Sequence, residues 1–145
     1  MALHLIKLCV GADSIDDLRD WVSRKALTAI AAGLEPHSFH VTRMVPKRGE
    51  ELLDGGSLYW VIKGQVQARQ RLTGIETFTD ADGIGRCKLI LGPEVVETAY
   101  QPRRAFQGWR YLQTSEAPRD LSALGVGTAE MPLELRRELA ELGLL

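Results

Sequence analysis

The stretch from residue 54 to residue 72 contains two strand-like runs on either side of a tight turn. Asp54-Gly55-Gly56 is a strong turn signal, an apolar run follows it at 58–63, and Gly64 separates this run from the next. On the second run two sets of side chains alternate: Gln65, Gln67, Arg69 and Arg71 on one face, and Val66, Ala68, Gln70 and Leu72 on the other. Because alternate residues of a strand point to opposite faces, the pattern predicts a hairpin or sharp bend carrying one row of long polar side chains.

The remaining elements follow from turn signals and periodicity. Residues 3–10 are mostly apolar and predict a central strand, and Ser14 followed by Asp17 predicts the start of a helix that ends near Gly33 and Pro36. Further strands are expected at 39–45, 86–91, 95–100 and 108–112, with a turn or two of helix at 47–53. Residues 113–131 are expected to be rich in loops, and residues 132–143 to form a short amphipathic C-terminal helix.

These elements predict an α+β fold. It consists of a curled, mostly antiparallel sheet of five to seven strands that can close into a barrel, an N-terminal helix and a short C-terminal helix. A chain of 145 residues fits one domain, here residues 1–145 with a core at 3–112. Its size is sufficient to fold without a disulfide or a metal.

Charge is distributed unevenly along the chain. The net charge is −1, yet residues 37–113 hold 11 Lys/Arg against 8 Asp/Glu, and no acidic residue lies between Thr98 and Ser115. A basic middle is compatible with an anionic partner.

Cys9 and Cys87 stand far apart in apolar contexts, which indicates free thiols in a reducing compartment. With no signal peptide and no long apolar run visible, we expect a cytoplasmic protein without a membrane partner.

The segment from Gln101 to Tyr111 combines three arginines with three aromatic side chains and contains no acid. Single-stranded nucleic acid is typically held by aromatic stacking beside a basic groove. The alternative is a loop that Phe106, Trp109 and Tyr111 anchor in the core while its arginines are merely solvated. Similarly, the polar row of residues 65–71 is either an ordinary wet sheet face or a surface for phosphates and bases.

Together these features favour a nucleic-acid-binding module without a cofactor, whose expected ligand is RNA or single-stranded nucleic acid. The expected site comprises Arg43, Lys47, Arg48, Lys63, Gln65, Gln67, Arg69, Arg71, Arg103, Arg104, Trp109, Arg110 and Tyr111. In this hypothesis the arginines contact phosphate, Gln65 and Gln67 line the groove, and Trp109 or Tyr111 stacks on bases. The hypothesis requires the polar row and the 101–111 segment to converge on one side of the sheet.

Two other functions stay open at this point. A nucleotide or another anionic metabolite, bound or transformed in a closed pocket, would require Arg43, Glu50 and Tyr59 to converge. A protein-interaction domain would show Trp21 or Trp60 in an exposed apolar patch. No catalytic motif is recognised, and His37 with His40 lacks the further ligands that a metal site needs.

Four segments resemble a bacterial family known as domain of unknown function 1489. They are residues 3–11, 40–44, 50–71 and 101–111. This resemblance brings no activity with it. A looser similarity is to PUA-like pseudo-barrels, including the ASCH and EVE domains, which implies a curled sheet with helices at its ends and binding of RNA or modified bases. The ASCH pattern G-x-K-x-x-E-x-R finds only Lys47 and Glu50, because Val45 and Leu52 replace its Gly and Arg.

Overall fold

A computed structural model describes residues 3–104 and 106–121 of the chain. Its elements in chain order are β1 (Leu3–Leu8), α1 (Ile15–Ala31), β2 (Ser38–Thr42), α2 (Gly49–Leu53), β3 (Ser57–Ile62), β4 (Gln65–Thr79), β5 (Gly85–Leu91), β6 (Val96–Pro102), β7 (Trp109–Gln113) and the 3-10 turn η1 (Thr114–Glu116). The C-terminal helix expected at 132–143, and the part of the loop-rich segment beyond residue 121, lie outside the described residues.

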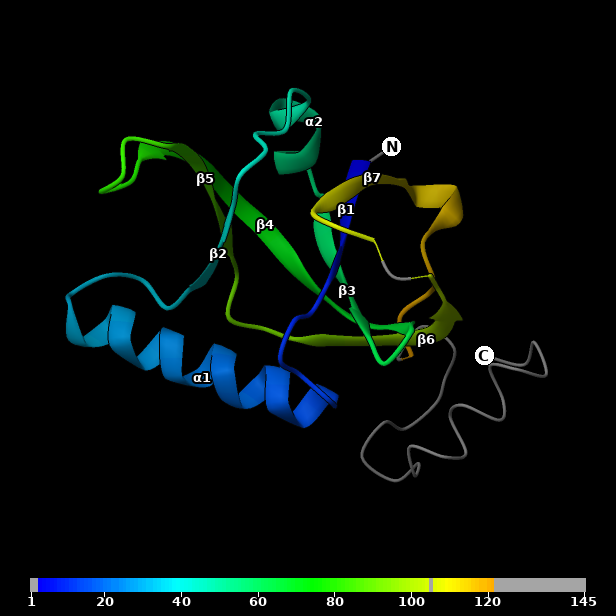
Figure 1. The fold of residues 1–145 in the computed structure, drawn as a ribbon. Helices are drawn as coiled ribbons and strands as arrows, with labels where there is room; N and C mark the ends of the chain where they lie inside the picture. The colour runs from blue at the N-terminus through cyan, green and yellow to red at the C-terminus, as the bar shows by residue number, and fades with distance from the viewer. Residues whose placement is uncertain (1–2, 105, 122–145) are drawn as a thin grey trace.

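The strands form one curled sheet in the order β2-β5-β4-β3-β1-β7, with β6 added beside β4. The α+β class and the mostly antiparallel pairing are confirmed, since β1 with β3 is the parallel exception among the described pairs. The described strands do not close into a barrel, because β2 and β7 stand at opposite ends of the order. Figure 1 shows β2 and β5 at one end of the sheet and β6 and β7 at the other.

Strand β4 organises this sheet because it is 15 residues long and has different partners along its length. Its first half pairs with β3 on one side and β6 on the other, whereas its second half pairs with β5. The register with β3 shifts between Trp60 and Val61, so that Gln67 becomes the extra residue between Val66 and Ala68. Such a bulge bends a strand and increases its twist, which suits a sheet that curls.

The predicted hairpin at Gly64 is confirmed. Lys63 and Gly64 join β3 to β4 with φ angles of 53° and 77°, the combination that a two-residue type I′ turn requires. The predicted helix start is confirmed as well, since the Ser14 side chain accepts a hydrogen bond from the Asp17 N–H at 3.2 Å. No helix in the described part of the chain is long and apolar enough to cross a bilayer.

Each face of the sheet buries its own apolar cluster. On one face α1 packs Ile15, Leu18 and Val22 against strand residues that include Leu58 and Trp60; Figure 1 shows α1 running along this side. On the second face a smaller cluster forms a second core, which comprises Ile6, Tyr59, Val61, Val66 and Leu112, with Leu8, Phe106 and Ala117 packed against it. All six residues of β3 are therefore buried, which explains its nearly continuous apolar sequence.

Candidate nucleic-acid interface

The connection from β6 to β7 brings three arginines to one open groove. Arg103 and Arg104 follow β6, Arg110 lies on β7, and all three line a hollow of about 660 Å³. Phe106 and Tyr111 also border it, and Glu116 supplies its acidic group. Because β7 is the last strand in the sheet order, this groove lies at an edge of the sheet.

Two of the arginines are held by contacts within the same segment. Arg103 donates from Nε and Nη2 to the Gln101 Oε1 at 3.1 and 3.0 Å, and Gln101 in turn donates to the backbone oxygen of Glu116 at 3.0 Å. The Arg110 guanidinium carbon lies 5.0 Å from the centre of the Phe106 ring. Arg103 thus uses two of its five N–H donors, which leaves three for an anionic ligand.

Tyr111 connects this groove to the basic segment before α2. Its hydroxyl oxygen accepts from the backbone N–H of Lys47 at 2.9 Å and from that of Arg48 at 3.2 Å. The Arg48 guanidinium lies 5.6 Å from the Tyr111 ring centre and pairs with Glu51 at 2.5 Å. Lys47 and Arg48 therefore lie beside β7, on a segment that contacts one of the groove's aromatic residues.

Trp109 is a core residue. It is 5% exposed, and its indole N–H donates to the backbone oxygen of Met44 at 2.8 Å. Its ring contacts Tyr111 edge-on with centroids 5.0 Å apart. The expectation that aromatics of this segment anchor in the core thus holds for Trp109, and of the two residues expected to stack, Tyr111 is the one at the groove.

The polar row on β4 does not form a continuous wet face. The bulge turns Gln67 inward, where it is fully buried and donates to the backbone oxygen of Ile62 at 2.8 Å. Gln65 is half-buried, and Arg71 is exposed. The alternation that the sequence predicts therefore breaks at Gln67, and none of the four residues of the row lines the groove beside β7.

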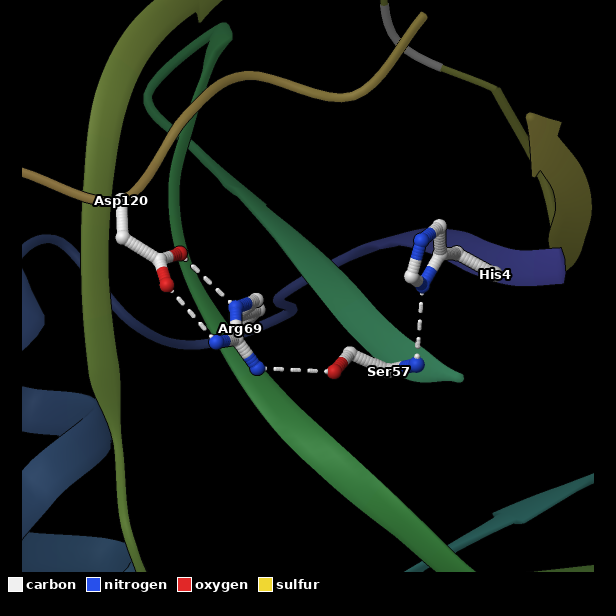
Figure 2. A network of polar contacts seen from close by, with 4 residues as sticks. All are labelled: His4, Ser57, Arg69 and Asp120. Atoms are coloured by element: carbon white, nitrogen blue, oxygen red, sulfur yellow. Dashed lines mark hydrogen bonds and ion pairs between the residues drawn. The ribbon is translucent and has the colours of Figure 1, made fainter. Parts of the chain in front are cut away.

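Arg69, the third member of the row, belongs to a polar network on the second face of the sheet (Figure 2). Its guanidinium donates to both carboxylate oxygens of Asp120, at 2.8 and 2.7 Å, and to the Ser57 hydroxyl at 2.9 Å. The hydrogen bond and charge of Asp120 raise the pKa of Arg69 above its ordinary value. Arg69 is consequently a permanently charged group, and three of its five N–H donors are used inside the protein.

His4 lies at the other end of this network (Figure 2). Its Nδ1 accepts from the backbone N–H of Ser57 at 3.0 Å, so the proton of the neutral ring is on Nε2, which lies 3.2 Å from the Thr114 hydroxyl. Burial, with a further contribution from the Arg69 charge, lowers the pKa of His4. Because His4 contacts the Ser57 backbone and the Ser57 hydroxyl instead accepts from Arg69, the two residues are not arranged as a nucleophile and its base.

The remaining basic residues of the expected site are distributed over other parts of the surface. Lys63 occupies the β3–β4 turn and pairs with Asp13 at 3.3 Å. This turn adjoins the groove segment, since Arg103 donates its backbone N–H to Gly64 at 2.8 Å. Arg43 is exposed just after β2. The structure thus brings together Arg103, Arg104, Arg110 and Tyr111, with Lys47 and Arg48 beside them, and it separates these from Gln67, Arg69 and Arg71.

No sequence pattern indicated Asp120 or Glu116 as parts of these sites. Asp120 reaches Arg69 because an isolated bridge pairs it with Thr98 of β6. Such a long-range contact leaves no periodic pattern in the sequence. Within residues 3–104 and 106–121, no group of three or more His, Cys, Asp and Glu side chains is placed to hold a metal ion.

Comparison with other proteins gives a family and no further detail. No curated protein and no solved structure matches the chain. One family model matches residues 5–145, nearly the whole length, and its description is a protein of unknown function. The resemblance noted in the sequence is therefore confirmed: the chain belongs to the DUF1489 family.

Proposed function

We propose that the groove beside β7 binds single-stranded nucleic acid, and RNA in particular. The observation that carries this proposal is the gathering of Arg103, Arg104 and Arg110 with Phe106 and Tyr111 around one open hollow. Guanidinium groups bind phosphate through paired hydrogen bonds, and aromatic rings stack on unpaired bases. Among the described residues that line the groove, one glutamate stands against three arginines, which gives this lining a surplus of positive charge.

Each group has a role that follows from its contacts. Arg104 and Arg110 are exposed and bind the phosphates. Gln101 holds the Arg103 guanidinium in one orientation, so the phosphate contact of Arg103 has the least freedom to move. Phe106 and Tyr111 offer partly exposed rings for stacking. Lys47 and Arg48 extend the basic path around β7, because the Tyr111 hydroxyl fixes their backbone.

A PUA-like assignment of the fold is part of this proposal. It is supported by the curled, unclosed sheet with α1 against one face and by the looser sequence similarity described above. Domains of that kind generally bind RNA, which is why RNA is favoured over single-stranded DNA.

Cys9 and Cys87 are free thiols, so we place this function in the reducing cytoplasm.

The binding test uses a fluorescent single-stranded RNA of about ten nucleotides, measured by anisotropy at low salt, where phosphate contacts are strongest. We expect Arg104→Ala and Arg110→Ala each to weaken binding and to reduce the slope of log K against log salt by about 0.7. Arg71→Ala is the matched control: it removes one exposed arginine outside the groove and leaves affinity unchanged.

Three results would overturn the proposal. They are the absence of RNA binding at low salt, equal losses for Arg71→Ala and Arg104→Ala, and saturation of the groove by a mononucleotide that the strand cannot displace. The last result would identify the alternative considered from the sequence, an anionic metabolite held by the same arginines. The groove's edge position supports a strand as the ligand. The burial of Tyr59 in the second core and the exposure of Arg43 and Glu50 support it as well, because the alternative expected these three residues to converge in a closed pocket.

A further inference from the structure

A second cavity lies on the opposite side of the sheet from the second core, between the β1–α1 loop, the first half of α1, β2 and β3. Its volume is about 430 Å³, within the range of small-molecule sites. Its walls include the indoles of Trp21 and Trp60, the imidazole of His40 and the thiol of Cys9. None of these residues lines the groove beside β7.

His40 is the group in this cavity whose polar atoms are not engaged. It packs edge-on against Trp60, with ring centroids 5.4 Å apart, and neither ring nitrogen makes a hydrogen bond within the described residues. Burial, assisted by the nearby Lys7 charge, lowers the pKa of His40 to about 4. At neutral pH the cavity therefore contains an uncharged imidazole with one free donor and one free acceptor.

The other side chains of the cavity wall limit the kind of ligand that can bind beside His40. Trp60 is 1% exposed and its indole N–H already donates to Gln70 at 2.9 Å, so it closes the floor of the cavity behind His40, and the half-buried indole of Trp21 is the accessible aromatic surface. Asp17 and Asp20 lie in the cavity wall with Arg24, and Arg24 pairs with Asp20 at 3.2 Å. The charges of this pair cancel, so the wall keeps the charge of one carboxylate, that of Asp17, which disfavours a phosphate or carboxylate ligand.

We infer that this cavity binds an uncharged, flat heteroaromatic ring of the nucleobase kind, with His40 hydrogen-bonded to a ring nitrogen, amino group or carbonyl. Aromatic walls favour a planar ring, and a neutral imidazole complements a neutral ligand edge. The ring can come from a free nucleoside or from one base of a strand. This inference does not depend on the groove beside β7, whose charge selects phosphate.

The ligand arm of the test compares adenosine, guanosine, cytidine and uridine with their 5′-monophosphates. Binding is followed by NMR of the His40 ring nitrogens and by quenching of tryptophan fluorescence. At least one nucleoside is expected to bind saturably, to shift the His40 resonances and to bind more tightly than its monophosphate. Asp20→Asn, which removes one carboxylate from the wall, is expected to reduce this preference.

The variant arm removes the hydrogen-bonding nitrogens while keeping the ring that packs on Trp60. His40→Phe is expected to weaken nucleoside binding about tenfold, as the loss of one or two hydrogen bonds predicts, and His40→Gln to restore part of it. His37→Ala is the matched control, since His37 lies outside this cavity and its ring contacts the Glu35 backbone. Circular dichroism and thermal melting establish that His40→Phe is folded.

A six-nucleotide single-stranded RNA distinguishes the two sources of the ring. If His40→Phe weakens binding of this RNA as well as that of the nucleoside, the ring is a base of the strand; if only nucleoside binding is weakened, the ligand is a free nucleoside. The inference is overturned if no nucleoside or RNA shifts the His40 resonances, if monophosphates bind more tightly than nucleosides, or if His40→Phe and His37→Ala have the same effect. Arg104→Ala, which tests the groove, should leave nucleoside binding unchanged.

Discussion

Arg69 and Asp120 form a two-point ion pair that joins β4 to the segment following η1. The Nε and Nη2 atoms of Arg69 donate to the two carboxylate oxygens of Asp120, and both side chains are about a quarter exposed, at 24% and 25%. Asp120 also bridges Thr98 of β6 through the backbone. The pair therefore fixes the segment after η1 against β6 and β4.

Breaking this pair should destabilise the protein. Arg69→Met leaves a partly buried Asp120 carboxylate without its partner, and we expect the free energy of unfolding to fall by about 2 kcal/mol, between the values for surface and fully buried pairs. Urea denaturation at pH 7 measures this loss. Arg24→Ala is the control, because the Arg24–Asp20 pair is about 70% exposed and should contribute little. Equal losses in the two variants would show that Arg69 is only a solvated surface charge.

Gly56 should not tolerate a side chain. A Cβ atom at this position would lie 2.2 Å from the Leu52 backbone oxygen and 2.3 Å from that of Leu3, so α2 and β1 would have to move. We expect Gly56→Ala to lower the free energy of unfolding by about 3 kcal/mol or to prevent folding. Gly85→Ala, where a Cβ meets nothing within 4 Å, should change stability by less than about 0.5 kcal/mol. Thermal melting of both variants tests the difference.

His40 should make stability depend on pH. Its pKa is lowered to about 4 in the folded protein from 6.5 in the unfolded chain, so between these values the unfolded chain binds a proton that the folded protein does not. The contribution of neutral His40 to the free energy of unfolding is therefore fully present above about pH 6.5, and it is lost as the pH falls toward 4. Allowing for partial exposure, we expect a loss of about 1 kcal/mol between pH 7 and pH 5.

His40→Phe should reduce this pH dependence without abolishing it. His4, whose pKa is also lowered, contributes in the same direction and is still present in this variant. Urea denaturation at pH 7 and pH 5 compares the variant with the unsubstituted protein. An identical decrease in both proteins would mean that the imidazole of His40 is protonated as readily in the folded state as in the unfolded chain.

The two cysteines should be slow to react in the native state. Burial raises the pKa of Cys9 to about 11 and also raises that of Cys87, which is fully buried. At pH 8 the thiolate fraction of Cys9 is then about a hundredfold smaller than that of an unperturbed thiol, and its reaction with a disulfide reagent slows accordingly. Absorbance of the released thiolate measures the rate, and urea should make both cysteines react quickly. A fast single-thiol phase in native protein, lost in Cys9→Ser, would contradict this expectation.

Much of the local structure could be predicted because its causes are local. Ser14 and Asp17 marked the start of α1, and Gly64 marked the β3–β4 turn, since each feature depends on backbone preferences within a few residues. The apolar run of β3 predicted a buried strand. The segment from Gln101 to Tyr111 predicted the arginines and the aromatic rings that now border one groove.

The distribution of the polar row could not be predicted in this way. Strict alternation places Gln67 beside Arg69 on one face, but the bulge opposite Trp60 and Val61 adds a residue and buries Gln67. Whether such a bulge forms depends on the twist that β3 and β6 impose on β4. The sequence of residues 65–71 does not by itself indicate that β3 and β6 are the neighbours of this strand.

The sequence by itself determined which segments are helix, strand and turn, because periodicity, capping and positive-φ glycine are properties of short stretches of chain. Only the tertiary structure decided which charges are free. Arg69 is paired with Asp120, 51 residues away, whereas Arg104 and Arg110 line the groove beside β7 and pair with no acidic side chain among the described residues. An arginine with a partner and one without are identical in sequence, and contacts between distant segments, formed when the sheet curls, are what distinguish them.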